Sequence, residues 1–298
     1  MLCLRKKERS GLRRPRRIGD MTMAGPTQRP STQDEVNYSV WSGRQGVARY
    51  AAAKGWIDSS EGMILPKLVS EYAGGAVLDL GVGGGRTIGL ASRAAGAFVA
   101  IDYVPELVQV ARQRFPGVDI RVGDARRLDF APESFDLVLF SINGIDAVSH
   151  TDRGAVLREV RRVLLPGGTF YFSTHNRSGP GPRERPWGPP PVTMRHPRSS
   201  VLSLLRRVWR FPVNVANYRR LRTLTELGPG WRVTTSGAHD FGIVIHYTTA
   251  AAAVAELREA GFAGPIRLWD DVYGTELSGD DPRLDGCWYF HIVARRDP

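Results

Sequence analysis

The chain has 298 residues, which is long enough to bury a substantial core in one large α/β domain with additions. Its formal charge of +11 at pH 7 is weak evidence for a nucleic-acid partner, because residues 1–20 alone hold eight Lys or Arg residues against two acidic ones. Its two cysteines, Cys3 and Cys287, give no basis for a disulfide framework or a thiolate metal site.

Residues 1–34 form a basic leader that we expect to be disordered. They are rich in Arg, Pro, Ser, Thr and Gln and have no apolar periodicity. Met21 and Met23 are alternative start positions within this leader. No apolar core follows the basic residues, and no uncharged apolar run reaches the length of a membrane span, so we predict a cytoplasmic protein with no membrane partner.

After a helical pattern over residues 34–73, apolar runs alternate with amphipathic ones from residue 76 onward. The predicted strands are residues 76–80, 97–102, 118–122, 135–141 and 168–174. The predicted helices between them are residues 86–95, 105–115 and 152–164. This alternation indicates a parallel sheet covered by helices on both faces, with a ligand crevice at the carboxyl ends of the strands.

Residues 176–242 interrupt the alternation and are predicted to be an insertion. The segment is rich in Pro and Gly at its start, and it continues with an arginine-rich helix at 199–224 and a short hairpin around 231–235. The alternation then resumes with a helix and two strands, which we expect at residues 249–260, 265–270 and 287–294.

The most informative segment is residues 77–87, where a buried strand runs into a glycine-rich turn and then a helix. The glycines tolerate positive φ angles and let backbone N–H groups approach a nucleotide-like ligand closely. A dinucleotide fingerprint requires a third glycine at the position of Arg86, and a P-loop requires a lysine that is absent. Neither of these two motifs therefore fits the turn.

The turn, together with the acidic residue Asp102 after the next strand, resembles the class I S-adenosylmethionine-dependent methyltransferases. The turn 123–126, the strand 135–141 and the segment 161–170 follow in the order of that family. The resemblance implies a doubly wound, mostly parallel seven-stranded sheet whose last two strands form an antiparallel pair at its edge. It also implies a helical lid at 35–73 and a substrate cap in the insertion, within a cofactor-binding domain at 74–298.

By this resemblance the cofactor is S-adenosylmethionine. Asp102 matches the acidic residue that binds the ribose hydroxyls, and Asp124 matches the one that contacts the adenine amino group. The expected cofactor contacts are Asp79, Gly81, Gly83, Gly85, Thr87, Asp102, Tyr103, Gly123, Asp124, Ala125, Ser141 and Asn143.

Methyl transfer requires mainly a nucleophile held in line with the methyl group, and a base only when the nucleophile loses a proton. The candidates for orienting or deprotonating an acceptor are Asn143, Asp146, His150 and His175. His175 ends a strand at the expected crevice, although it could instead bind the following loop. His150 could simply belong to the start of a helix. His196, His239 and His291 show no metal-ligand pattern, and we assign no metal.

We predict transfer of a methyl group to N, O or an activated carbon of a small molecule, in natural-product or secondary metabolism. The alternative is an RNA methyltransferase that uses the arginine-rich insertion, although the motif of base-amine methyltransferases is absent after the strand 135–141. A nicotinamide oxidoreductase and a cofactor-binding protein without catalysis are further alternatives. A homodimer is compatible with the apolar residues of the predicted helix 199–224.

Overall fold

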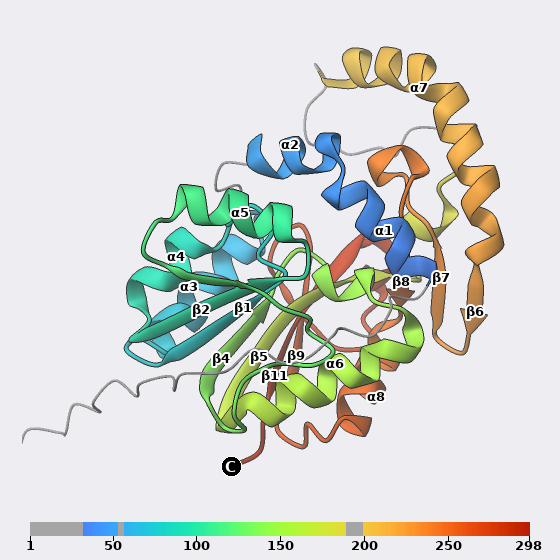
Figure 1. Ribbon diagram of the computed structural model, residues 1–298. Helices are drawn as coiled ribbons and strands as arrows, with labels where there is room; N and C mark the ends of the chain where they lie inside the picture. Colours follow the sequence, from blue (N-terminus) through green and yellow to red (C-terminus); the bar gives the residue numbers. More distant parts are fainter. Residues whose placement is uncertain (1–31, 53–56, 189–198) are drawn as a thin grey trace, which may run out of the picture.

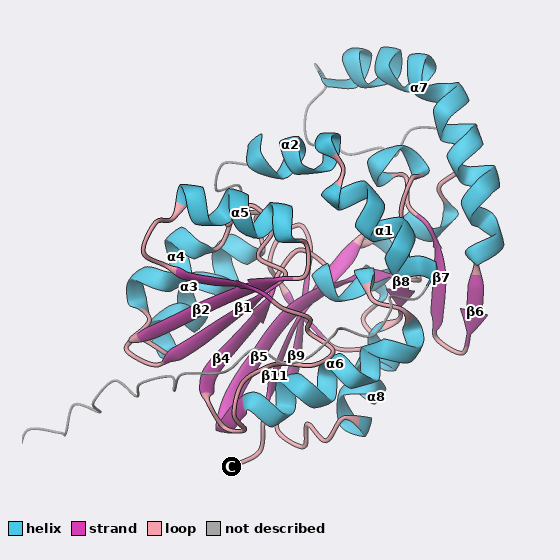
Figure 2. Cartoon of the chain, in the orientation of Figure 1, coloured by secondary structure: helices cyan, strands magenta, loops and turns pink. Residues whose placement is uncertain are grey.

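The computed structural model describes residues 32–52, 57–188 and 199–298. In this part of the chain, eleven strands form one sheet that is covered by helices on both faces (Figures 1 and 2). The strands are β1 (Ala76–Leu80), β2 (Ala97–Asp102), β3 (Asp119–Val122), β4 (Phe135–Phe140), β5 (Leu164–Asn176), β6 (Glu226–Gly228), β7 (Trp231–Thr235), β8 (Val244–Thr248), β9 (Ile266–Asp270), β10 (Glu276–Leu277) and β11 (Tyr289–Arg295). The α-helices are α1 (Thr32–Ser42), α2 (Arg44–Ala52), α3 (Glu61–Glu71), α4 (Ile88–Ala94), α5 (Pro105–Arg114), α6 (His150–Val163), α7 (Ser199–Leu221) and α8 (Ala250–Glu259).

The main sheet has the strand order β10-β9-β11-β5-β4-β1-β2-β3. The pairs from β5 through β4, β1 and β2 to β3 are parallel, whereas β11 is antiparallel to both β5 and β9. This arrangement confirms the predicted doubly wound α/β class and the antiparallel pair at the edge. Because the order reverses beside β1, the carboxyl ends of β1 and β4 flank a crevice.

The predicted number of seven strands is wrong for the described residues, because β10, β8 and the two strands of the insertion, β6 and β7, add to it. The main cause is the length of β5, which runs for 13 residues and continues beyond the end of β4. Its last residues, His175 and Asn176, pair in parallel with Tyr247 and Thr248 of β8. Strand β8 thus satisfies backbone groups of β5 that β4 does not reach, and it brings β7 and β6 into the same sheet.

Alternate residues of the central strands pack on opposite faces of the sheet. Leu137 and Tyr171 pack with α3 residues such as Leu65, whereas Val138 and Phe170 belong to the larger core beneath α6 and α8. All five side chains are at most 1% exposed. Burial of such a side chain contributes about 1.5–3 kcal/mol, so this two-sided core fixes the strand ends that surround the crevice.

The N-terminal helices lie over the carboxyl ends of the strands (Figure 1). Helix α1 begins at Thr32, so residues 32–34 of the predicted leader are helical, and the rest of the leader lies outside the described residues. The side chain of Asn37 accepts a hydrogen bond from the Val244 amide at 2.9 Å and donates one to the Val244 carbonyl at 2.7 Å. This pair of hydrogen bonds joins α1 to the first residue of β8.

The insertion combines a hairpin with a long helical arm. The predicted hairpin is confirmed as β6 and β7. The helix predicted at 199–224 corresponds to α7, which ends at Leu221 and is followed by a 3₁₀ turn over Arg222–Leu224. In Figure 1, α7 extends away from the sheet at the upper right. Cys287, which we expected within the last strand, lies two residues before β11. Within the described ranges, no helix is both long enough and apolar enough to cross a bilayer.

Candidate functional site

A pocket of about 280 Å³ lies at the carboxyl ends of the central strands, and residues of α1 and α2 contribute to its lining. We call the wall formed by the glycine turn and by Asp102 and Asp124 the glycine-loop side. The histidine side is the opposite wall, where Asn143 and His175 line the pocket and Asp146 lies behind them. The position agrees with the crevice that the alternating pattern predicted.

The glycine turn has the backbone shape that its sequence predicted. Gly81 and Gly83 line the pocket with φ angles of 62° and 53°, in the left-handed region that side chains rarely adopt. A Cβ atom on Gly81 would lie 2.7 Å from the ring of Phe140. Gly81 therefore lets the turn pack against Phe140, and the side-chain-free backbone of Gly81 and Gly83 forms a cradle in the pocket wall.

Asp102 is fixed at the edge of this cradle by backbone donors. Its carboxylate accepts hydrogen bonds from the Gly83 amide at 2.8 Å and from the Val104 amide at 2.9 Å. Burial raises the pKa of Asp102 to about 6, although these hydrogen bonds oppose the shift. Asp102 lines the pocket, so its position agrees with the predicted cofactor contact.

Four of the predicted cofactor contacts do not line the pocket: Asp79, Gly85, Thr87 and Ser141. The buried carboxylate of Asp79 accepts a hydrogen bond from the Thr87 hydroxyl, and burial raises its pKa to about 7. A Cβ atom on Gly85 would lie 2.6 Å from the ring of Phe115, so this glycine allows close packing behind the turn. These residues therefore shape the turn instead of facing the pocket.

Ser141 belongs to a buried polar cluster behind the turn. Its hydroxyl hydrogen-bonds to Glu61, a fully buried residue of α3. Glu61 also accepts two hydrogen bonds from the Arg86 guanidinium, at 2.6 Å and 3.0 Å. This cluster anchors the glycine turn to α3. It explains the arginine that excluded the dinucleotide fingerprint.

The predicted adenine residues Tyr103, Gly123, Asp124 and Ala125 all line the pocket. Arg126, to which sequence reasoning gave no role, also lines it and binds Asp124 at 2.7 Å. The same guanidinium forms an ion pair with Asp34 of α1. Because Asp34 and Arg126 are far apart in the sequence, no local pattern could have revealed the bridge between them.

Aromatic residues of α1 and α2 close the same part of the pocket. Tyr38 and Trp41 pack edge-on against Tyr103, with ring centroids 5.6 Å and 6.2 Å apart. Tyr50 of α2 lies against the glycine turn, where a Cβ atom on Gly83 would be 3.2 Å from its ring. Trp41 and Tyr50 line the pocket, so these helices form part of its wall.

The histidine side is organised around Asp146, whose side chain is fully buried. Its Oδ2 atom lies 2.7 Å from His175 Nδ1 and accepts a hydrogen bond from the His175 amide at 2.6 Å. Its Oδ1 atom accepts hydrogen bonds from Thr174 at 2.6 Å and from Arg153 at 2.9 Å. Because the carboxylate accepts the proton on Nδ1, the lone pair of His175 is on Nε2.

Asn143 stands beside His175 on a strained turn. Its side-chain nitrogen is 3.4 Å from His175 Nε2, and its backbone N–H donates to the Ser173 hydroxyl at 2.8 Å. Ile142 and Asn143 have φ angles of 48° and 57°, which is unusual for a β-branched residue such as Ile142. Such strain is often found at functional sites. The Oδ1 atom of Asn143 has no hydrogen-bond partner among the described residues.

His150, the fourth predicted catalytic residue, does not line the pocket. It is the first residue of α6, after Ser149, whose hydroxyl caps the helix by accepting from the Asp152 amide at 3.2 Å. Its ring stacks on Trp231, with centroids 3.7 Å apart. The structure therefore brings Asn143, Asp146 and His175 together and leaves His150 outside this group.

The pocket lining also contains residues that sequence reasoning did not select. Ile142 belongs to the turn after β4. Ile243 is the residue before β8, and Ile245 lies within β8. Ser236, Ala238 and His239 are contributed by the insertion. Burial lowers the pKa of His239 to about 4. No motif marks these positions, because their place depends on how the insertion packs.

Comparison with known proteins gives matches in this same region. Residues 77–168 match the family model described as "Methyltransferase domain". A probable S-adenosylmethionine-dependent methyltransferase from Mycolicibacterium smegmatis is 31% identical, over 58% of this chain and 62% of its own length. The ubiquinone biosynthesis O-methyltransferase of Xanthomonas oryzae pv. oryzae is 37% identical, over 36% of this chain and 46% of its own length.

A solved structure with a similar fold is that of 1,6-didemethyltoxoflavin-N1-methyltransferase from Burkholderia thailandensis, with bound 1,6-didemethyltoxoflavin and S-adenosylhomocysteine. The similarity covers 93% of this chain and 94% of that one, with a TM-score of 0.52 and 17% sequence identity. At this identity the likeness shows the fold alone. The alignments with the two curated relatives span less than two thirds of those proteins.

Proposed function

We propose that this chain is a class I S-adenosylmethionine-dependent methyltransferase and that it transfers a methyl group to a hydroxyl of a small aromatic molecule. The match of residues 77–168 to the family model described as "Methyltransferase domain" supports the first part of this proposal. The observation that carries this proposal is the His175–Asp146 pair, which presents His175 Nε2 to the pocket. A base at this position supports an O acceptor better than the predicted N acceptor, whereas the predicted activated carbon could also use it to lose its proton.

The residues of the glycine-loop side fit the cofactor. The cradle at Gly81 and Gly83 exposes backbone to the pocket, and Asp102 offers a fixed carboxylate for ribose hydroxyls. Tyr103 and Asp124 provide the aromatic and polar wall expected around the adenine. When bound here, S-adenosylmethionine supplies the electrophilic methyl group.

A base on the histidine side distinguishes between acceptor types. A phenol must lose its proton at or before methyl transfer, whereas a neutral amine attacks through its own lone pair. His175 Nε2 can take the phenolic proton, and the buried carboxylate of Asp146 stabilises the imidazolium that forms. Asn143 Oδ1 offers a hydrogen-bond acceptor beside the same atoms.

The helical lid and the substrate cap remain part of this proposal. They are supported by Trp41 and Tyr50 on one wall and by Ala238 and His239 on another. The isoleucines in the pocket lining, Ile142, Ile243 and Ile245, favour an apolar or aromatic molecule. The Xanthomonas relative is named as an O-methyltransferase of ubiquinone biosynthesis, and an O acceptor is what we propose for this chain. A role in secondary metabolism and the alternative of RNA as substrate stay predictions.

Matched acceptors would test the proposal. The untagged protein would be incubated with S-adenosylmethionine and with pairs of aromatic molecules that differ only in carrying a hydroxyl or an amino group. We expect methylation of the hydroxyl members, with products identified by mass spectrometry. Methylation of only the amino members, or of RNA but of no small molecule, would contradict the proposal.

A further inference from the structure

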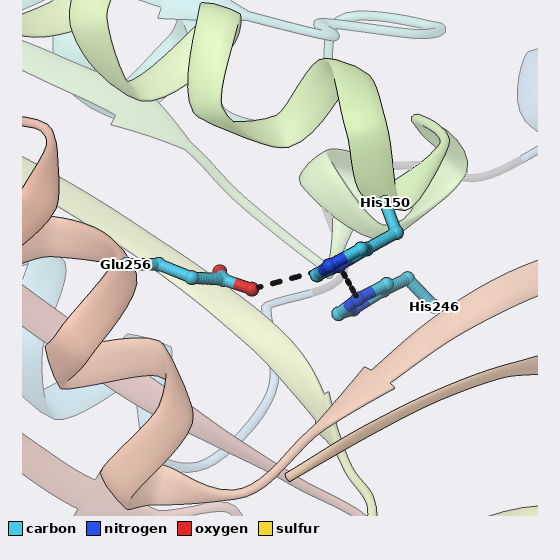
Figure 3. Close-up of side chains that lie close together, drawn as sticks. All are labelled: His150, His246 and Glu256. Carbon is cyan, nitrogen blue, oxygen red and sulfur yellow. Dashed lines mark hydrogen bonds and ion pairs between the residues drawn. The ribbon is translucent and has the colours of Figure 1, made fainter. Parts of the chain in front are cut away.

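Outside the pocket, three potential metal ligands from three separate elements converge. They are His150 at the start of α6, His246 in β8 and Glu256 in α8 (Figure 3). His150 Nδ1 lies 3.1 Å from His246 Nε2 and 4.0 Å from Glu256 Oε1. We propose that these three side chains form a binding site for a divalent transition-metal ion of the zinc type, a property that goes beyond the proposed methyl transfer.

The distances suit such an ion. All three ligand atoms lie within 4.8 Å of one another. In a tetrahedral zinc site with bonds of about 2.0–2.2 Å, the ligand atoms are separated by about 3.3–3.5 Å. The histidine pair is already close to this spacing, and a small rotation of Glu256 would complete it. Two imidazoles and one carboxylate are an established zinc donor set, with a fourth position left for water.

The surroundings hold the ligands in this orientation. The Arg153 guanidinium donates to Glu256 Oε2 at 3.0 Å and 3.2 Å, which leaves Oε1 directed at His150. Trp231 stacks on the His150 ring with an interplanar angle of 17°. Residues that orient metal ligands in this way are typical of the outer shell of metal sites. The side chains of His150 and Glu256 are 30% and 18% exposed, so an ion can enter from solvent.

Charge also favours a cation at this site. The single positive charge of Arg153 lies between two carboxylates, those of Asp146 and Glu256, so these three side chains carry a net negative charge. His246 is fully buried, so the surrounding side chains hold its ring in place.

An ion at this site would tie the insertion to the methyltransferase domain. His246 belongs to β8, which joins the hairpin of the insertion to β5, whereas α6 and α8 cover the main sheet. A ligand that binds only the folded chain stabilises it. We therefore expect zinc to raise the thermal unfolding temperature of the protein.

The test uses the untagged full-length protein, freed of metal with a chelator. Cobalt(II) would be titrated while its visible absorption is recorded, because tetrahedral cobalt has a characteristic intense band. We expect saturation at one equivalent per chain and displacement of cobalt by zinc. His150→Ala and Glu256→Gln should each weaken cobalt binding at least about tenfold and remove the thermal stabilisation by zinc. Glu259→Gln, at an exposed position of α8, is the matched control and should bind like the wild type.

Circular dichroism would establish that each variant is folded. Absence of saturable cobalt and zinc binding by the folded wild type would overturn the proposal and leave the two histidines as a hydrogen-bonded pair. A variant that combines His150→Ala with Glu256→Gln is also needed. Unchanged cobalt binding by this folded variant would overturn the proposal too, because the ion would then lie elsewhere. These readouts do not use methyl transfer, so failure of the metal site leaves the proposed function untouched.

Discussion

The two sides of the pocket bury carboxylates in different ways. On the glycine-loop side, Asp102 is held by backbone amides and Asp79 by a neighbouring hydroxyl, and burial raises the pKa of both groups. On the histidine side, Asp146 is held by the guanidinium of Arg153, which is 1% exposed. Asp102 and Asp79 therefore depend on neutral donors that are close in the sequence, whereas Asp146 depends on an ion pair between buried side chains.

The largest expected effect separates the chemical roles of the two sides. His175→Gln should lower kcat for a phenolic acceptor by about 10²–10⁴-fold, because it removes the base but not the pocket. The affinity for S-adenosylhomocysteine, measured by isothermal titration, should stay nearly unchanged. A nitrophenol that is already ionised at the assay pH should lose much less rate than an ordinary phenol. Equal losses for both acceptors would contradict a role of His175 as base.

The next prediction concerns the ion pair itself. Arg153→Met should lower the free energy of unfolding by about 3–5 kcal/mol, because it leaves the carboxylate of Asp146 buried without its cation. Arg158→Met is the matched control on the exposed face of α6 and should change stability by no more than about 0.5 kcal/mol. Urea unfolding curves would measure both. If the two variants unfold alike, the histidine side does not depend on this ion pair.

The same contrast explains what the sequence could predict. The glycine turn, Asp102 and the turn at Asp124 are short motifs, each next to a strand end, so their pattern predicted both the fold class and this wall of the pocket. Asp146 and His175 were predicted only as separate candidates, and their pairing was not predicted, because it depends on how the segments after β4 and in β5 pack. The bridge from Arg126 to Asp34 and the strand β8 depend on packing between distant segments, which leaves no periodic pattern.

A smaller effect is expected at the edge of the glycine-loop side. Asp102→Ala should weaken binding of S-adenosylhomocysteine by about 1–3 kcal/mol, because hydrogen bonds from the ribose would be lost. Isothermal titration of the folded variant would measure this change. The KM for the methyl acceptor, determined at saturating cofactor, should change little. An unchanged cofactor affinity would show that Asp102 supports the turn without contacting the ligand.

The last prediction uses the pH dependence that burial gives to Asp79. The pKa of Asp79 rises from its ordinary value of 3.8 to about 7 in the folded protein. Between these two pH values the folded protein therefore keeps a proton that the unfolded chain has released. This group therefore lowers the stability as pH rises from about 4 to about 7, by up to about 1.4 kcal/mol per pH unit. Asp79→Asn stays neutral and can still accept the hydrogen bond from Thr87. Urea unfolding across this range should show that the free energy of unfolding of the variant rises relative to that of the wild type as pH rises. A constant difference between the two free energies would mean that Asp79 is ionised throughout the range. The contrast between the two sides of the pocket would then fail.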